Sequence, residues 1–178
     1  AFFRNKVGTG NVLCIMDSDG SNKRYINDSN GNPIVGDSPF FTPDGATIVF
    51  VRIDPDKQEG AVYKVSVDGG NVTQLTNASD FDELPRVSPN GQYVICKYAP
   101  VKGGKSDVGR FSINQTPQTS SVTNLTNTSN DDEDSPMYSY EGDKITYMGT
   151  AGNYSMEIWV MNSDGTNKTR LTNNSERD

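Results

Sequence analysis

The residues of this chain with the clearest chemical potential are acidic and recur at one place in a pattern. An acidic residue stands two positions before a proline at Asp37, Glu83 and Asp134, and Asp178 ends the chain in the same register. Rotational repetition of the pattern would place the four carboxylates around one axis. Several converging carboxylate oxygens are what a hard cation such as Ca²⁺ requires. The spacing therefore predicts a calcium site, and the alternative is that each carboxylate caps its own turn or pairs with a neighbouring Arg or Lys.

The absence of histidine from the sequence limits the chemistry further. It excludes a Ser-His-Asp or Cys-His mechanism within this chain, and it excludes zinc, copper or iron held by imidazole. Acidic residues are plentiful, but no spacing marks a catalytic carboxylate pair. We therefore predict a protein without enzymatic activity that requires no cofactor, with Ca²⁺ as the ion its residues would suit. Cys14 and Cys96 stand in apolar segments and are predicted to be buried free thiols, with a disulfide between them as the alternative.

The composition narrows the class of partner. The formal net charge is -7 and the sequence pI is about 4.6, which disfavours binding to nucleic acid or to an anionic membrane surface. No run of apolar residues approaches the roughly 20 that span a membrane. We therefore expect a protein or glycan partner, no nucleic acid and no membrane insertion. The sequence contains no signal-peptide pattern, so we expect it to represent a mature form or a fragment.

Nine Asn-x-Ser/Thr triplets give the chain a second kind of candidate site. Three of them, at Asn77, Asn127 and Asn173, begin at the last residue of a repeated LTN segment and are the strongest candidates for N-glycosylation. Part of the excess has a simple cause, because the repeat itself carries these endings. Glycans at these positions would indicate an exposed surface outside the cytoplasm.

An internal repeat positions all of these residues. Three segments share one opening: SPFFTPDGATIVFVR begins at Ser38, LPRVSPNGQYVICKY at Leu84 and SPMYSYEGDKITYMG at Ser135, at spacings of 46 and 51 residues (84 − 38 and 135 − 84). A second element such as AVYKVSVDGGN and a closing element such as TQLTN follow, although the third copy of the second element is degraded to VGRFSINQTPQ. The chain is predicted to be one domain, 1–178, made of the approximate units 1–37, 38–83, 84–134 and 135–178.

Each unit contains four short β-rich stretches, bounded by Asp-Gly, Asn-Gly or Glu-Gly turns that are typical of tight hairpins. Apolar side chains alternate as in strands, with Ile48 and Phe50 on one face and Val49 and Val51 on the other. No window has a helical period. Four antiparallel strands repeated every 46–51 residues indicate a propeller blade, and blades must stack because one sheet cannot bury both faces. The predicted fold is all-β, a β-propeller with about four four-stranded antiparallel blades in this chain.

The position within the repeat at which the sequence begins leads to further predictions. The segment AFFR at Ala1 aligns with VFVR at Val49, so the first unit is expected to lack its opening strand. Either the sequence is a piece of a longer propeller, or a neighbouring molecule donates the strand, which predicts self-assembly through an incomplete blade. The third strands carry matching residues that are predicted to fill the core between blades: Cys14, Tyr63, Phe111 and Trp159.

The pattern P-x-x-S-P-D-G-x-x-I-x-F … I-W-V-M-N-x-D-G-x-N-x-x-x-L-T resembles the repeat of TolB-type β-propellers over nearly the whole chain. The fourth copy, from Ser135, is the most similar, and the third departs most. The resemblance implies a non-catalytic module for protein or glycan recognition or for surface assembly, in the periplasm, outside the cell or at the cell surface. The alternative is the propeller domain of a larger enzyme, such as a propeller-capped serine peptidase whose catalytic domain is absent here.

Overall fold

The computed structural model describes residues 1–6, 10–54, 59–77, 83–99, 104–117, 121–150 and 155–173. These residues form fifteen β-strands and no α-helix. In chain order the strands are β1 (Phe2–Lys6), β2 (Gly10–Ile15), β3 (Arg24–Tyr25), β4 (Asp37–Phe41), β5 (Thr47–Asp54), β6 (Glu59–Ser66), β7 (Thr73–Gln74), β8 (Glu83–Val87), β9 (Tyr93–Tyr98), β10 (Asp107–Ser112), β11 (Thr123–Asn124), β12 (Glu133–Tyr138), β13 (Lys144–Thr150), β14 (Met156–Asn162) and β15 (Thr169–Arg170).

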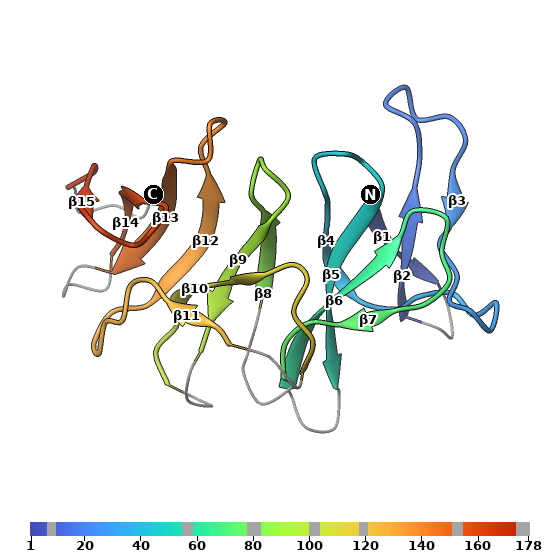
Figure 1. Cartoon of the computed structure of the whole chain (residues 1–178), viewed down its shortest axis with the longest axis horizontal. Coiled ribbons are helices and arrows are strands. Elements are labelled where there is room, and N and C mark those ends of the chain that lie inside the picture. Colours follow the sequence, from blue (N-terminus) through green and yellow to red (C-terminus); the bar gives the residue numbers. More distant parts are fainter. Residues whose placement is uncertain are drawn as a thin grey trace.

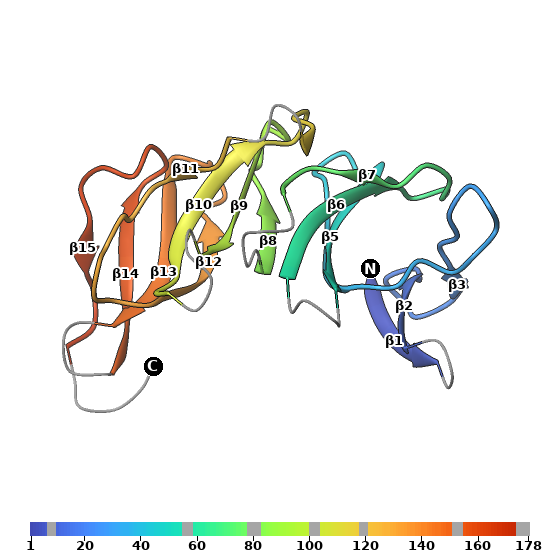
Figure 2. The ribbon, with the colours of Figure 1, turned by 90° about the horizontal axis from the view of Figure 1, so that it is seen from below.

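The strands form four antiparallel sheets that follow one another along the chain, and we call them blades 1 to 4. Blade 1 has three strands in the order β1-β2-β3, and the other blades have four each: β4-β5-β6-β7, β8-β9-β10-β11 and β12-β13-β14-β15. Figures 1 and 2 show the blades side by side in an arc, with blade 1 at one end and blade 4 at the other. The predicted all-β fold of successive antiparallel blades is confirmed, and so is the three-stranded first blade. No helix in the described ranges is long and apolar enough to cross a membrane.

The predicted tight turns close the hairpins between the first two strands of blades 2, 3 and 4. In blade 2 the Gly45 N–H donates to the Thr42 carbonyl, and the Asp44 carboxylate accepts a hydrogen bond of 2.6 Å from the Thr42 hydroxyl. Gly45 has a φ of 70°, and Gly91 and Gly142 repeat this conformation at 72° and 78°. Glycine adopts positive φ without steric cost, so the Asp-Gly, Asn-Gly and Glu-Gly pairs fix where each strand reverses.

The hydrophobic core lies in the three contacts between neighbouring blades, which we call junctions 1–2, 2–3 and 3–4. Each junction contains one cluster of buried residues drawn from both blades. The clusters are Leu13, Ile26, Ile34, Ile48, Phe50 and Val65 at junction 1–2; Val49, Val62, Leu75, Val87, Val94, Cys96, Phe111 and Ile113 at junction 2–3; and Ile95, Val108, Leu125, Ile145, Tyr147 and Met161 at junction 3–4. Blades 2 and 3 are therefore covered on both faces, as stacking requires. Cys14 and Cys96 are buried, as predicted, and neither forms a disulfide.

The sequence analysis assigned the wrong residue of blade 3 to one repeated position of the third strand. The position in β10 that corresponds to Tyr63 and Trp159 is Gly109, and Phe111 lies two residues further on. A Cβ at Gly109 would lie 2.7 Å from the Cβ of Tyr98, so the Tyr98 side chain leaves no room at this position for a ring such as Tyr63 in blade 2 or Trp159 in blade 4. The sequence alignment slipped because this segment lacks the Asp-Gly turn that anchors the other copies. Phe111 is nevertheless a core residue, with 2% of its surface exposed, whereas Tyr63 and Trp159 are half-buried.

Candidate functional site

The acidic residues of the calcium prediction lie at the start of the first strands of blades 2, 3 and 4. The residue after each acid has a positive φ, 51° at Ser38, 53° at Leu84 and 49° at Ser135, and the pairing register shifts at the same place in all three strands. Such a β-bulge bends the strand and re-aims its side chains. The Asp37 carboxylate accepts a hydrogen bond of 2.6 Å from the Ser38 N–H, and Asp134 accepts one of 2.6 Å from the Ser135 N–H. Two of the acids therefore cap their own bulges.

A lysine joins two of the acids across the boundary between blades 3 and 4. Lys97 Nζ lies 3.4 Å from Glu83 Oε2 and 3.5 Å from Asp134 Oδ2, so one ammonium group serves both carboxylates. Asp178 lies outside the described residues. Within the described ranges, no group of three or more His, Cys, Asp or Glu residues is placed to hold a metal ion. The calcium site stays a prediction.

A groove runs across the ends of blades 2, 3 and 4, where their first strands finish. We call this hollow of about 720 Å³ the three-blade groove; residues that line it include Phe40, Arg86, Pro89, Met137, Tyr138 and Tyr140. Met137 is 50% exposed and Tyr140 is 91% exposed. The Arg86 guanidinium lies over the Phe40 ring at 5.2 Å from the centroid, and burial lowers its pKa. The groove thus combines exposed apolar side chains with one cation.

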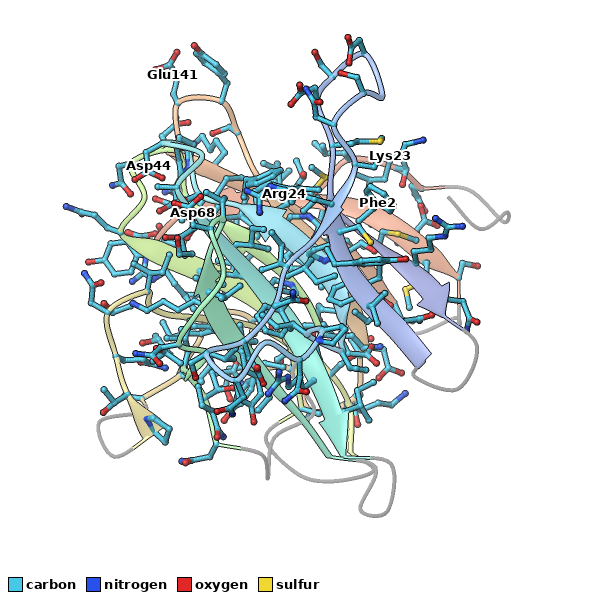
Figure 3. The ribbon with its side chains drawn as sticks, turned by 90° about the vertical axis from the view of Figure 1, so that its right-hand side faces the viewer. Phe2, Lys23, Arg24, Asp44, Asp68 and Glu141 are labelled. Atoms are coloured by element: carbon cyan, nitrogen blue, oxygen red, sulfur yellow. The ribbon has the colours of Figure 1, made fainter. Side chains whose placement is uncertain are left out.

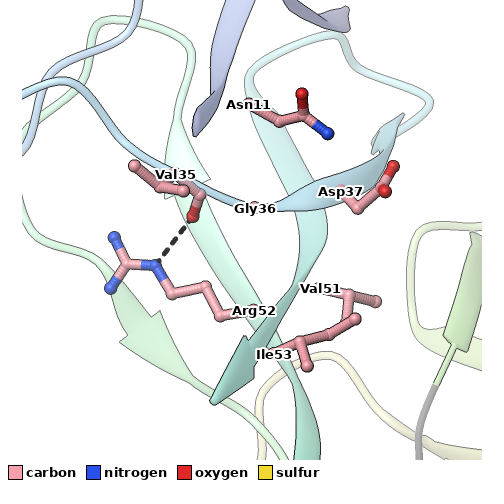
Figure 4. A pocket seen from close by; sticks show the side chains of 7 residues that line it. All are labelled: Asn11, Val35, Gly36, Asp37, Val51, Arg52 and Ile53. Carbon is pink, nitrogen blue, oxygen red and sulfur yellow. Dashed lines mark hydrogen bonds between the residues drawn. The ribbon is translucent and has the colours of Figure 1, made fainter. Parts of the chain in front are cut away.

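A second hollow, of about 300 Å³, lies at junction 1–2 (Figure 4). Arg52 Nε donates a hydrogen bond of 3.2 Å to the Val35 carbonyl, and the Asp37 side chain lies near the opposite wall. Gly36 permits this close approach of two blades, because a Cβ there would clash with the Val51 carbonyl oxygen. The pocket offers a ligand one carboxylate and a guanidinium that already binds the backbone, so it suggests no particular ligand.

A comparison with known protein families identifies the family of this chain. A family model for the TolB β-propeller domain matches residues 10–177. The chain belongs to the TolB β-propeller family. The TolB homologs of Chlorobium chlorochromatii and Chlorobaculum tepidum are 29% and 30% identical to it over 136 and 139 residues, which are 74% and 72% of this chain. The matches cover 27% of each relative, so the chain spans about a quarter of the length of these TolB homologs.

Solved structures agree with the family on the fold. TolB from Acinetobacter baumannii superposes with a TM-score of 0.73 at 20% identity, covering 98% of this chain and 41% of that protein. A puromycin-hydrolyzing peptidase from Mycobacterium tuberculosis has a TM-score of 0.64 at 12% identity, covering 92% of this chain and 27% of the peptidase. At such identities the likeness establishes the TolB-type propeller architecture and not an activity.

The structure brings together two buried acids that the sequence analysis did not single out. Asp107 and Glu133 are each 3% exposed and lie at junction 3–4. The Thr126 hydroxyl is 2.9 Å from Asp107 Oδ1 and 3.3 Å from Glu133 Oε2, and the Thr128 hydroxyl is 2.9 Å from Glu133 Oε1. Burial, followed by the negative charges of Asp107 and Asp131, raises the pKa of Glu133 to about 7, although hydrogen bonds from the two threonines oppose the shift. This carboxyl therefore changes its protonation near neutral pH.

The threonine that contacts both acids belongs to the closing element of the TolB-type repeat, which is visible in the sequence. The threonine of each LTN segment accepts a hydrogen bond of 2.9 Å from a third-strand backbone N–H, at Thr76, Thr126 and Thr172. The repeated threonine is thus structural, since it ties the closing segment to the third strand. In blade 3 the same threonine reaches Asp107 and Glu133 because the third strand begins with an acid and the next blade begins with another.

The three candidate glycosylation sites share one repeated position. Asn77, Asn127 and Asn173 directly follow these threonines, and all three are exposed. Glycosylation there is untested and stays a prediction. Asn124 also begins a sequon, but it differs in its surroundings: its amide donates to Asp107 at 2.8 Å, and the sequon threonine, Thr126, is buried.

We expect the 178-residue chain, produced in its native source, to have an intact mass above the 19.4 kDa of the bare chain. Because Asn127 is exposed, Asn127→Gln should remove the mass of one glycan, measured by mass spectrometry of the intact protein. Asn124→Gln is the matched control and should remove none, since the Asn124 amide is bound to Asp107 and the threonine of its sequon is buried. Native material with the mass of the bare chain would contradict the prediction.

Proposed function

We propose that this chain is a non-catalytic module that binds a protein in the periplasm through the three-blade groove. Its family supports a protein partner: a relative from Francisella tularensis, named Tol-Pal system protein TolB, is 32% identical over 82 residues, which are 46% of this chain and 18% of that relative. The absence of histidine supports a binding role over hydrolysis by a Ser-His-Asp mechanism within these residues. The similarity to TolB homologs, which are periplasmic proteins, supports the periplasm as the location.

The exposure of Met137 and Tyr140 is the observation that carries the assignment of the groove. Large apolar side chains exposed in a hollow mark interaction sites on soluble proteins. Blades 2, 3 and 4 each contribute to the groove, and their packed junctions hold its walls in place. An extended segment of a partner would lay apolar side chains against Met137, Tyr140 and Pro89. Arg86, which lines the groove, would favour a carboxylate on that segment.

The test measures binding of the purified soluble domain of Pal, the protein named with TolB in the Francisella relative, by isothermal titration calorimetry. We expect Met137→Asp and Tyr140→Asp each to weaken binding at least tenfold, which corresponds to about 1.4 kcal/mol. The physical reason is that a carboxylate in the groove would be desolvated beside apolar groups of the partner. Both residues are exposed, so neither substitution removes core packing.

Ile53→Asp is the matched control, because Ile53 is 44% exposed and lies at the pocket of junction 1–2 instead of the three-blade groove. It should leave the affinity for Pal within a factor of two. An equal loss in the control and the groove variants would place the binding face elsewhere. A wild-type chain that does not bind Pal at all would contradict the Tol–Pal partner.

A second candidate function is the propeller domain of a larger peptidase, which the superposition on the puromycin-hydrolyzing peptidase favours. In that case the gene would also encode an α/β-hydrolase domain with a G-x-S-x-G nucleophile segment. Sequencing the complete reading frame separates the two candidates, since a TolB-type protein would carry no such segment.

A further inference from the structure

Each of the three junctions contains a hydrogen bond from a basic side chain of one blade to a backbone carbonyl of the next. In every case the carbonyl belongs to the residue that directly follows the third strand of its blade. A hydrogen bond from a charged donor is stronger than one between neutral groups. The three bonds run from Arg24 to Val67 (2.9 Å), from Lys64 to Ile113 (2.9 Å) and from Arg110 to Ser163 (2.6 Å).

The basic residues that donate these bonds come from two different strands. Lys64 and Arg110 stand at the same position of the third strand, and each pairs with a threonine of the fourth strand. In blade 1 this third-strand position is Ile15, and the basic residue is its cross-strand partner, Arg24. Figure 3 shows Arg24 beside Asp68 of blade 2, whose carboxylate lies 3.8 Å from the guanidinium. The basic residue thus differs in position between blades, while the bond across the junction is kept.

The residue that accepts this bond is also tied to a turn of its own blade. In blade 3 the Ile113 N–H donates 3.1 Å to the carbonyl of Gln92, which directly follows Gly91 in the turn between the first and second strands. The same bond recurs in the other two blades, from Val67 to Ala46 (3.0 Å) and from Ser163 to Asp143 (2.9 Å). One residue therefore joins the turn of its own blade to the basic side chain of the preceding blade.

These turns line the three-blade groove. Pro89 and Asn90 belong to the turn of blade 3, and Tyr140 and Glu141 belong to the turn of blade 4. The two turns also lie against each other, since a Cβ at Gly142 would be 3.2 Å from Pro89 Cδ. The position of each turn therefore sets the shape of the groove on both sides of the boundary between blades 3 and 4.

We propose that Lys64 and Arg110 are positioning residues of the three-blade groove. Each holds the turn of the next blade in place through the residue after that blade's third strand. Without the basic group, the carbonyl of that residue loses its charged donor, and the bond between the residue and the turn opens more often. The value of this for binding rests on the proposed function, whereas the holding of the turns rests on the hydrogen bonds themselves.

The test is hydrogen exchange of single backbone amides, measured by NMR on the 178-residue chain without a ligand. Lys64→Met removes the charged group and retains an apolar stem. It should speed exchange of the Ile113 and Gly91 amides at least about fivefold, because both bonds belong to the turn that is released. Exchange of the Ser163 amide should stay within about a factor of two of the wild type, because junction 3–4 keeps its own donor. Arg110→Met should do the reverse.

Relocation of the basic residue separates a held turn from a general loss of stability. Lys64→Ile combined with Thr73→Arg gives blade 2 the arrangement of blade 1, where Ile15 pairs with Arg24. The double variant should restore the exchange rate of the Ile113 amide, and Lys64→Ile alone should not. Lys64→Arg should also keep the wild-type rate, because blade 3 makes the same bond with arginine. Unchanged exchange in Lys64→Met, equal acceleration at both junctions in each variant, or a double variant that restores nothing would overturn the proposal.

Calorimetry with the soluble domain of Pal measures what the positioning contributes to binding. Lys64→Met and Arg110→Met should each weaken binding about threefold, less than the tenfold expected for Met137→Asp, because a turn is loosened and no groove residue is replaced. Wild-type affinity in both variants, beside faster exchange, would overturn their role in the groove. A wild-type chain that does not bind Pal contradicts the proposed function, and the exchange experiment then still decides whether the two basic residues hold the turns.

Discussion

Phe50→Ala is expected to lower the free energy of unfolding by about 3–5 kcal/mol, which is the range for deletion of a fully buried aromatic side chain. Phe50 is 0% exposed and belongs to the cluster of junction 1–2. Its ring lies 6.3 Å from the ring of Phe3 in blade 1 and 6.0 Å from that of Tyr63 in its own blade, centroid to centroid. The substitution therefore leaves a cavity between two blades that neither blade can fill by itself.

Urea unfolding followed by fluorescence and circular dichroism measures this loss. Tyr140→Ala is the control: it also removes an aromatic ring, but Tyr140 is 91% exposed, so we expect a change within about 0.5 kcal/mol. In a stacked array, stability is approximately the sum of blade and junction terms. A loss of less than about 1 kcal/mol in Phe50→Ala would show that junction 1–2 contributes little to folding and that blade 1 is held by other contacts.

The blade architecture follows from local features of the sequence, which explains why it could be predicted. The Asp-Gly, Asn-Gly and Glu-Gly turns determine where strands reverse, and the alternation around Phe50 determines which side chains face a neighbour. Both signals reside in segments of fewer than about ten residues. Where the local signal is missing, as in the degraded third copy, the alignment slipped by two residues and matched Phe111 in place of Gly109.

The candidate site depends on contacts between blades, which a single segment does not encode. Lys97 lies between Glu83 and Asp134 because two first strands and one second strand meet at the boundary of blades 3 and 4. In the sequence, Lys97 has no counterpart among the other copies and resembles any strand lysine. Glu133 is equally hidden, as one of four consecutive acids from Asp131 to Asp134. Glu133 is buried by β10 and by the segment 126–128, and these come close to it only once the blades are stacked.

That burial makes the charge of Glu133 costly, and Glu133→Gln is expected to stabilise the protein by up to about 3 kcal/mol at pH 8. The pKa of this carboxyl is about 7 in the folded protein, against an ordinary value of 4.5. One unit of pKa difference corresponds to about 1.4 kcal/mol. Glutamine keeps a carbonyl oxygen for the hydroxyls of Thr126 and Thr128 and has no charge to bury beside Asp107.

The direction of the pH dependence follows from proton linkage. Between pH 4.5 and 7 the folded protein holds a proton on Glu133 that the unfolded chain has released, so the free energy of unfolding of the wild type falls as the pH rises through this range. Below pH 4.5 the carboxyl is protonated in both states and costs nothing; above pH 7 the cost is complete. The advantage of Glu133→Gln should therefore shrink to less than about 1 kcal/mol at pH 5.

Urea unfolding of wild type and variant at pH 5 and pH 8 measures the difference, and other groups that titrate in both proteins cancel in it. Glu141→Gln is the matched control, because the same chemical change at an exposed turn carboxylate should give a difference of less than about 0.5 kcal/mol at both pH values. The result distinguishes between two explanations of how Glu133 is accommodated beside Asp107. A pH-dependent gain shows that Glu133 is a proton-binding group that the stacking of blades 3 and 4 forces into the protein interior. A pH-independent loss would show that the charged carboxylate is stabilised where it lies, by Thr126 and Thr128, and that its pKa is not raised.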